Sequence, residues 1–417
     1  MRTHRLRWWV ATLLLASLAV LAVQPALALV ALETKLVASD AAYSDHFGAG
    51  IANGVAVSGD TMVAGAYLDD HGGGVDAGSA YVFVRSMGLW TQEAKLVASD
   101  AAPNDLFGQS VSIDGDVIAV GSFMDDDRGS HSGSVYVYRR SGGVWTQEAK
   151  LTASDGADGD ELGISVAIFG NTLVAGAAWS DARGADSGAV YVYRWNGSGW
   201  VQEAKLVPSD GIAGDLFGRS VALNGDTVVA GALLADAPAV DSGAAYVFRW
   251  NGTAWVQEAK LLASDGSKED YFGFSASVYG DTAVVGAYRW GPGNSERGAA
   301  YVFRRSGTVW AQESKLTPAD GTPQALFGRS VSIYGERVVI GSPAAVNGGV
   351  RTGAAYLFSR AGTVWTQELR LVASDGASND RYGEAVSSYG NTVGVGAPQN
   401  APFGIPFAGA AYMYDLT

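Results

Sequence analysis

Pairs of aspartates five residues apart are the most regular candidates for chemistry in this sequence. Six pairs recur along the chain: Asp40 with Asp45, Asp100 with Asp105, Asp155 with Asp160, Asp210 with Asp215, Asp265 with Asp270, and Asp375 with Asp380. Asp320 starts a seventh pair, but Ala325 stands at the second position. Calcium prefers carboxylate oxygens as ligands. Asp side chains also cap turns by accepting hydrogen bonds from backbone N–H groups, so the spacing fits both calcium binding and turn capping.

Calcium is therefore a candidate cofactor, and nine aspartates are its candidate ligands. They are Asp100, Asp105, Asp125, Asp126, Asp127, Asp155, Asp160, Asp210 and Asp215. Open loops of this kind predict weak binding, with dissociation constants on the order of 0.1 to 1 mM. A zinc site is the alternative near His46, His71 and His131, although their spacing matches no zinc-ligand pattern and favours solvated loop histidines.

Aromatic and aliphatic residues interrupt the acidic pattern in the second half of the chain and form a candidate partner-binding set. The set consists of Tyr288, Trp290, Phe403, Ile405 and Phe407, with Trp179 as a further candidate for stacking on a sugar. Neighbouring prolines stiffen these loops and reduce the entropy lost on binding. The alternative is that the side chains fold back and plug a central channel.

The elements that position these residues are repeats. A tryptophan recurs every 55 residues from Trp90 to Trp365, and a glycine recurs every 55 residues from Gly108 to Gly383, with Gly48 before them. Each of the seven units contains four short alternating segments, and tight turns such as IDGD and LNGD join the first two. The pattern predicts an all-β chain folded as a seven-bladed β-propeller of four-stranded antiparallel blades.

The last unit ends after its third strand, at AAYMYDLT, whereas LETKLVASD at residues 32–40 matches a fourth strand. The N-terminal segment is therefore expected to pair in the last blade and close the ring, which removes two exposed sheet edges. The predicted organisation is a signal peptide at residues 1–28 followed by a single propeller domain at residues 29–417. The acidic and apolar loops then share one end of the propeller, which we call the long-loop face; it consists of the loops between second and third strands and the connections between blades.

The units resemble the FG-GAP repeat family, which includes the propeller of integrin α chains. At the repeat position Phe-Gly occurs five times, starting at residues 47, 107, 217, 272 and 327, and Gly396-Ala397-Pro398 preserves the second half of the motif. Integrin-like propellers hold calcium in a D-x-D-x-D-G-x-x-D loop between the first two strands. The corresponding turns here are as short as IDGD, so the resemblance does not extend to those calcium sites. It implies a secreted or surface-exposed binding platform.

The N-terminal segment and the composition restrict location and partners. Residues 1–28 contain three arginines, an apolar run from Trp8 to Val23 and the small-x-small signal Ala26-Leu27-Ala28, which predict secretion to an extracellular, periplasmic or envelope location. The remainder has 25 Lys and Arg against 42 Asp and Glu, which argues against nucleic acid as a partner. There is no cysteine, so stability must come from a packed core. No later segment is long enough to span a membrane, and we expect a monomer.

Three functions fit these features. The first is a non-catalytic binding or adhesion propeller with a protein or glycan partner on the long-loop face. The second is a polysaccharide-active lyase or hydrolase with its site at the channel mouth, although no G-x-S-x-G, H-E-x-x-H or phosphate loop occurs and paired Asp in nearly every unit are unlike a single active site. The third is a purely structural envelope protein.

Overall fold

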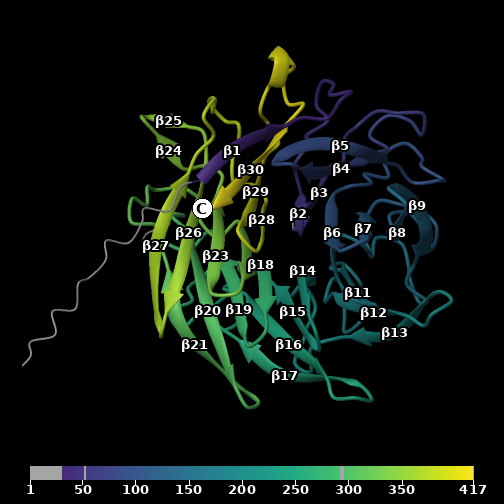
Figure 1. Ribbon diagram of the computed structural model, residues 1–417. Helices are drawn as coiled ribbons and strands as arrows, with labels where there is room; N and C mark the ends of the chain where they lie inside the picture. The colour runs from purple at the N-terminus through teal and green to yellow at the C-terminus, as the bar shows by residue number, and fades with distance from the viewer. Residues whose placement is uncertain (1–30, 51–52, 292–294, 417) are drawn as a thin grey trace, which may run out of the picture.

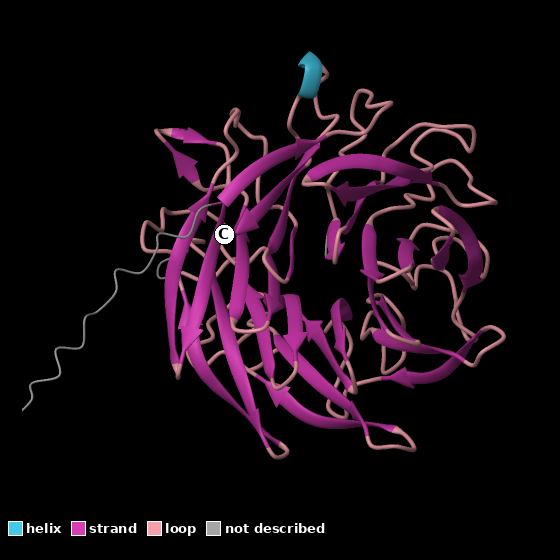
Figure 2. Cartoon of the chain, in the orientation of Figure 1, coloured by secondary structure: helices cyan, strands magenta, loops and turns pink. Residues whose placement is uncertain are grey.

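Seven four-stranded antiparallel sheets form a ring in the computed structural model, which describes residues 31–50, 53–291 and 295–416 (Figure 1). Nearly all of the regular structure is strand, and one short 3-10 helix, η1 (Pro402–Gly404), sits at the tip of a loop that extends away from the ring (Figure 2). The predicted seven-bladed propeller is confirmed. The predicted signal peptide lies outside the described residues. In the part of the chain that is described, no helix is long and apolar enough to cross a membrane.

The first four blades each contain four consecutive strands, from the axis outward. Blade 1 has β2 (Val55–Ser58), β3 (Thr61–Ala66), β4 (Ser79–Ser86) and β5 (Leu89–Leu96). Blade 2 has β6 (Ser110–Asp114), β7 (Val117–Ser122), β8 (Ser134–Ser141) and β9 (Val144–Leu151). Blade 3 has β10 (Ser165–Phe169), β11 (Thr172–Ala177), β12 (Ala189–Trp195) and β13 (Trp200–Leu206). Blade 4 has β14 (Phe217–Asn224), β15 (Thr227–Ala232), β16 (Ala244–Trp250) and β17 (Trp255–Leu261).

The other three blades repeat this order with one insertion and one closure. Blade 5 has β18 (Phe272–Tyr279), β19 (Thr282–Ala287), β20 (Ala299–Ser306) and β21 (Val309–Leu316). Blade 6 has β22 (Ser330–Tyr334), β23 (Arg337–Ser342), β26 (Ala354–Ala361) and β27 (Val364–Leu371), with a small hairpin, β24 (Val346–Asn347) and β25 (Val350–Arg351), between its second and third strands. Blade 7 has β28 (Val386–Tyr389), β29 (Thr392–Ala397), β30 (Ala410–Leu416) and β1 (Ala31–Leu36).

Glycines of the repeat allow neighbouring blades to touch through their backbones. A Cβ atom at Gly65 in β3 would come within 1.8 Å of the carbonyl oxygen of Gly108 in the next blade. Gly108 itself has a φ of +99°, which side chains rarely tolerate. Ser110 continues the seam, because its Oγ donates a hydrogen bond at 2.7 Å to the carbonyl oxygen of Gly163 in blade 3. The recurring glycines are therefore required by the close packing of blades.

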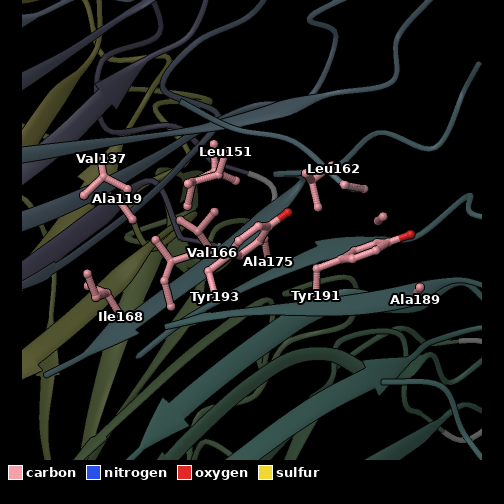
Figure 3. Packing of buried hydrophobic residues seen from close by; sticks show 14 of the residues in the cluster. Ala119, Val137, Leu151, Leu162, Val166, Ile168, Ala175, Ala189, Tyr191 and Tyr193 are labelled. Carbon is pink, nitrogen blue, oxygen red and sulfur yellow. The ribbon is translucent and has the colours of Figure 1, made fainter. Parts of the chain in front are cut away.

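The hydrophobic core lies in layers between successive blades. One layer combines Val137 and Leu151 of blade 2 with Val166, Ile168 and Tyr191 of blade 3 (Figure 3). Tyr191 is fully buried, with its ring in this layer. Six further layers of similar size complete the ring. This arrangement gives a chain without cysteine a large apolar core.

The ring closes through its N-terminal strand, as the sequence predicts. β1 pairs antiparallel with β30 over six residue pairs, from Ala31 opposite Leu416 to Leu36 opposite Ala411. β2 of blade 1 also contacts β28 of blade 7, so the innermost strands form a closed circle. The strand ends at Leu36 and does not extend to Asp40. Asp40 instead lies in a turn, where its carboxylate accepts hydrogen bonds from Tyr81 and Lys95.

Candidate functional site

The long-loop face is built as the repeat predicts, with its two kinds of loop in direct contact. In blade 1 the backbone N–H of Asn104, in a connection between blades, donates to the carbonyl of Val75, in a loop between second and third strands. The N–H of Leu106 donates in the same way to the carbonyl of Asp76. The paired aspartates and the apolar loop residues therefore share this end of the propeller.

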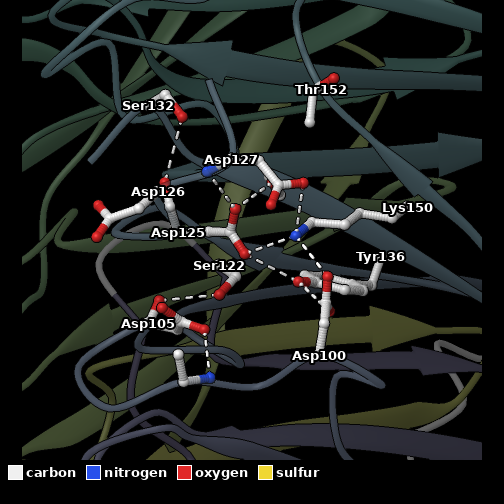
Figure 4. A network of polar contacts seen from close by, with 12 residues as sticks. Asp100, Asp105, Ser122, Asp125, Asp126, Asp127, Ser132, Tyr136, Lys150 and Thr152 are labelled. Carbon is white, nitrogen blue, oxygen red and sulfur yellow. Dashed lines mark hydrogen bonds and ion pairs between the residues drawn. The ribbon is translucent and has the colours of Figure 1, made fainter. Parts of the chain in front are cut away.

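The first aspartate of each pair binds a cation supplied by the protein itself. In blade 2 the ammonium of Lys150 lies 2.8 Å from Asp100, 2.9 Å from Asp125 and 2.7 Å from Asp127 (Figure 4). The hydroxyl of Tyr136 donates to both Asp100 and Asp125 at 2.9 Å. Burial opposes ionisation of Asp100, but the hydrogen bonds from Lys150 and Tyr136 outweigh it and lower the pKa of this carboxyl. The lysine thus occupies the centre of a three-carboxylate cluster.

The same contact recurs in every blade, and we call it the Asp–Lys–Tyr network. The ion pairs, at 2.5 to 2.8 Å, are Lys95 with Asp40, Lys150 with Asp100, Lys205 with Asp155, Lys260 with Asp210, Lys315 with Asp265, Arg370 with Asp320, and Lys35 with Asp375. A tyrosine hydroxyl also donates to Asp40, Asp100, Asp155, Asp265 and Asp375. Sequence reasoning found the aspartates but missed these lysines and tyrosines, although both recur with the repeat.

The second aspartate of each pair caps a turn. Its Oδ2 accepts a hydrogen bond from the backbone N–H three residues earlier, at 2.6 to 2.9 Å, in Asp45, Asp105, Asp160, Asp215, Asp270 and Asp380. Burial raises the pKa of Asp45 and Asp105 to about 6. These buried side chains have the local role that turn capping predicts.

The remaining candidate metal ligands lie apart from one another. Asp126 accepts a hydrogen bond from the backbone N–H of His131, and His71 Nε2 lies 2.9 Å from the carbonyl oxygen of Gly78. His46 instead contacts the hydroxyl of Tyr67 at 3.3 Å. Across residues 31–50, 53–291 and 295–416, no three His, Asp or Glu side chains are arranged to hold a metal ion.

The predicted apolar partner residues divide into covered and exposed groups. Trp290 is half-buried against the blade 5 core, and the Lys315 ammonium lies 3.1 Å from the centre of its rings. Tyr288 is half-buried, with its ring centre 4.5 Å from that of Phe274. Trp179 packs against a small cluster that includes Phe123. Three of the six candidates therefore contribute to packing.

The loop that carries η1 presents the other three candidates. Phe403 is 86% exposed, Phe407 is 39% exposed, and Ile405 between them is half-buried. The ring of Phe407 lies 6.3 Å from that of Tyr43, which is 67% exposed and was not singled out from the sequence. We call Tyr43, Phe403 and Phe407 the aromatic loop patch.

A pocket at the centre of the long-loop face was not predicted. Its cavity volume is about 140 Å³, and its walls include His46, Tyr67, Gln109, Arg329 and Arg381. Much of the wall comes from the residue that follows Phe-Gly, or the matching Leu-Gly or Tyr-Gly, in each repeat, a position we call the axial ring. Its members are Ala49, Gln109, Ile164, Arg219, Phe274, Arg329 and Glu384.

The opposite end of the propeller also has a hollow, although the sequence predicts only tight turns there. Its volume is about 490 Å³, and its wall includes Phe169, Tyr279, Tyr334 and Tyr389 from inner strands. The three tyrosine rings, from the successive blades 5, 6 and 7, pack against one another at a tilt, with centres 4.8 and 4.7 Å apart. These residues precede the turn glycines, so the repeat brings them together at the axis.

The repeats match a known family. The model for the FG-GAP repeat matches the chain seven times, at residues 30–83, 90–138, 145–193, 200–248, 255–303, 310–358 and 365–414. Each range runs from the outermost strand of one blade to the third strand of the next, so the first contains the closing strand β1 of blade 7. No curated protein matches the sequence.

Proposed function

Because the chain belongs to the FG-GAP repeat family, and because its repeated acids are engaged within the fold, we propose that it is a secreted, non-catalytic propeller that binds a protein or glycan through its long-loop face. The secreted location rests on the signal-peptide pattern of residues 1–28. An adhesive role is consistent with several loops acting together on one rigid scaffold.

The aromatic loop patch is the observation that carries this proposal. Phe403 has φ +55° and ψ +17°, a left-handed conformation that costs a non-glycine residue about 1 kcal/mol. Its ring is 86% exposed, so folding gains little burial in return. Large exposed aromatic side chains are typical anchors of binding sites. Phe403 is therefore the proposed anchor, and Phe407 and Tyr43 extend the contact surface.

The proposed binding function does not depend on calcium. The carboxylate cluster of blade 2 already surrounds the ammonium of Lys150, and the second aspartates of the pairs are committed to backbone N–H groups. A divalent ion at Lys150 would have to displace a partly buried cation with three charged partners. We propose instead that these acids stabilise the loops that carry the binding surface.

Binding assays on variants of the patch test the proposal. Wild-type protein, Phe403→Ala and Phe407→Ala are applied to a printed glycan array and to immobilised collagen. Loss of an anchor of this type weakens binding by about 2 kcal/mol, roughly 30-fold, while the melting temperature stays nearly unchanged because the ring is exposed. Leu89→Ala, at a residue 71% exposed on the outer strand β5, is the matched control and is expected to bind as wild type does.

Other results of these assays would contradict the proposal or indicate a different function. Equal binding by wild type and the two Phe variants would contradict the patch as the anchor. Release of sugars from any glycan or polysaccharide would make the protein an enzyme. Absence of binding to every surface would favour a structural role in the envelope.

A further inference from the structure

The axial ring concentrates positive charge on a protein that is strongly acidic overall. The chain carries a formal net charge of −14. In the pocket, Glu384 accepts from Arg329 at 2.7 Å and from Arg381 at 2.9 Å, so two arginines share one carboxylate. Arg219 lies outside the pocket wall but adds a third guanidinium nearby, because Arg219 and Arg329 both lie over the ring of Phe274, at 4.8 and 4.2 Å from its centre.

Two buried polar atoms of the axial ring have no partner among the described residues. Arg219 is 8% exposed, and its Nη1 makes no hydrogen bond. Gln109 is 1% exposed, and its Oε1 makes none either. An unpaired buried polar group costs about 1 to 3 kcal/mol. Burial and the nearby Arg329 also lower the pKa of Arg219 to about 9, which leaves it protonated at neutral pH.

The polar groups of the pocket wall determine which hydrogen-bond partners a ligand must supply. In the wall, two arginines, Arg329 and Arg381, face the single carboxylate of Glu384, and this excess favours a negatively charged acceptor on the ligand. The Oε1 of Gln109 needs a donor, which a carboxylate or sulfate does not have. The pocket wall also contains neutral polar groups, the hydroxyl of Tyr67 and the side chains of His46 and Gln399. A ligand that satisfies the whole wall carries an anionic group and several hydroxyls.

We propose that the axial pocket of the long-loop face binds a sugar acid, the uronic acid residue of an acidic glycan. Its carboxylate lies against Arg329 and Arg381, and its hydroxyls donate to Gln109 and contact the neutral polar wall. The cavity of about 140 Å³ accommodates one such residue, which would be the end or a protruding unit of a glycan chain. An acidic peptide also satisfies the arginines and has backbone N–H donors for Gln109, but a sugar brings several hydroxyls to the neutral polar wall as well, so the pocket favours the sugar.

This inference rests on the proposed function only in placing ligands on the long-loop face. The aromatic loop patch and the axial pocket are separate contacts, although His46 of the pocket and Phe407 of the patch lie 6.2 Å apart, centre to centre. Phe403 lies outside the pocket wall. Binding of a free uronic acid by the Phe403→Ala variant therefore separates the two.

The test is calorimetric titration of the full-length mature protein with sodium glucuronate, with glucose as the neutral counterpart. We expect wild type to bind glucuronate at least tenfold more tightly than glucose. Arg381→Gln should weaken glucuronate binding at least tenfold, because it removes one of the two arginines beside the carboxylate. Arg297→Gln, at an exposed arginine in a loop of the same face, is the matched control and should stay within twofold of wild type.

Gln109→Leu distinguishes binding from a structural role. Leucine has a similar size and no unpaired polar atom, so the variant should melt at a higher temperature than wild type. It should nevertheless bind glucuronate several-fold more weakly, because the hydroxyl loses its acceptor. A structural residue would change both properties in the same direction.

Three results would overturn the assignment. Equal affinity for glucuronate and glucose would remove the role of the arginines. Unchanged glucuronate binding in both Arg381→Gln and Gln109→Leu would place binding elsewhere. Tighter, Arg381-dependent binding of a hexaglutamate peptide would make the ligand an acidic protein segment instead of a sugar.

Discussion

The Asp–Lys–Tyr network and the axial ring lie on the same face but differ in how they use polar groups. The network repeats in all seven blades, and each first aspartate meets a lysine or arginine of its own blade. The axial ring has a different residue in almost every blade, and two of its buried polar atoms have no partner among the described residues.

This difference separates structure from function in a repeat protein. A role in folding is needed in every blade, so the residues that fulfil it recur with the period. A ligand on the axis contacts each blade once and from a different direction, so the residues that bind it need not recur. Buried groups that stay unpaired cost stability in the free protein, and a ligand that pairs with them recovers that cost.

The closing strand gives the largest expected effect. Deletion of residues 31–36 removes six residue pairs with β30, the buried side chain of Leu36 and the ion pair of Lys35 with Asp375. We expect a loss of several kcal/mol and a fall in melting temperature of 10 °C or more, measured by circular dichroism. Leu32→Ala, at a side chain 62% exposed, is the control. An unchanged melt after the deletion would show that blade 7 does not need its network lysine.

Replacement of the network lysine gives the next largest expected effect on stability. Lys150→Met leaves Asp100, Asp125 and Asp127 facing one another, and Asp125 is only 3% exposed. The loss should be about 3 kcal/mol in urea unfolding. Lys260→Met, whose partner Asp210 is half exposed, should lose at most about 1 kcal/mol.

The Lys150→Met variant also tests whether calcium can bind at the carboxylate cluster. Millimolar calcium should raise the melting temperature of Lys150→Met, because the three carboxylates then lack their cation, and should leave wild type unchanged. An equal rise in both proteins would show that calcium binds without displacing the lysine.

Smaller effects distinguish the two aspartates of a pair. The lowered pKa of Asp100 means that its stabilisation is present above the unfolded pKa and is lost as pH falls through the folded pKa. Because the Asp100 side chain is about half exposed, Asp100→Asn should lose at most about 1 kcal/mol at pH 7 and less in acid. The pKa of Asp105 is raised to about 6, so its ionisation opposes folding above pH 6.

Asp105→Asn should consequently be as stable as wild type at pH 7, or slightly more so, and the advantage should disappear by pH 4. Urea unfolding of both variants at pH 4 and pH 7 measures this. Equal destabilisation of the two variants at pH 7 would contradict the assignment of different roles to the paired acids.

The fold could be predicted from the sequence because period, strand alternation and turn glycines all agree. The closing strand was also predictable, since residues 32–40 match the strand that the last unit lacks. The turn-capping role of the second aspartates follows from local geometry, which sequence spacing reports directly. Interactions that repeat along the chain can thus be predicted from the sequence alone.

The axial pocket was not predictable in the same way. Gln109, Arg329 and Glu384 are far apart in the sequence and meet only because ring closure brings the same repeat position of different blades to one axis, and Arg381 joins them from the same turn as Glu384. The exposure of the aromatic side chains could not be predicted either, because Trp290 and Phe403 both interrupt the repeat and look alike in the sequence. Only the fold shows that Lys315 covers Trp290, whereas Phe403 stays 86% exposed.

Parallel calorimetric titrations of the wild-type protein with calcium chloride and with sodium glucuronate test the central claim most directly. Repeated acids that serve the fold, and unrepeated axial residues that bind a ligand, predict saturable heat with glucuronate and none with calcium up to millimolar concentration. Saturable heat with calcium, and none with glucuronate, would show that the repeated acids are the binding site and that the axial ring is structural.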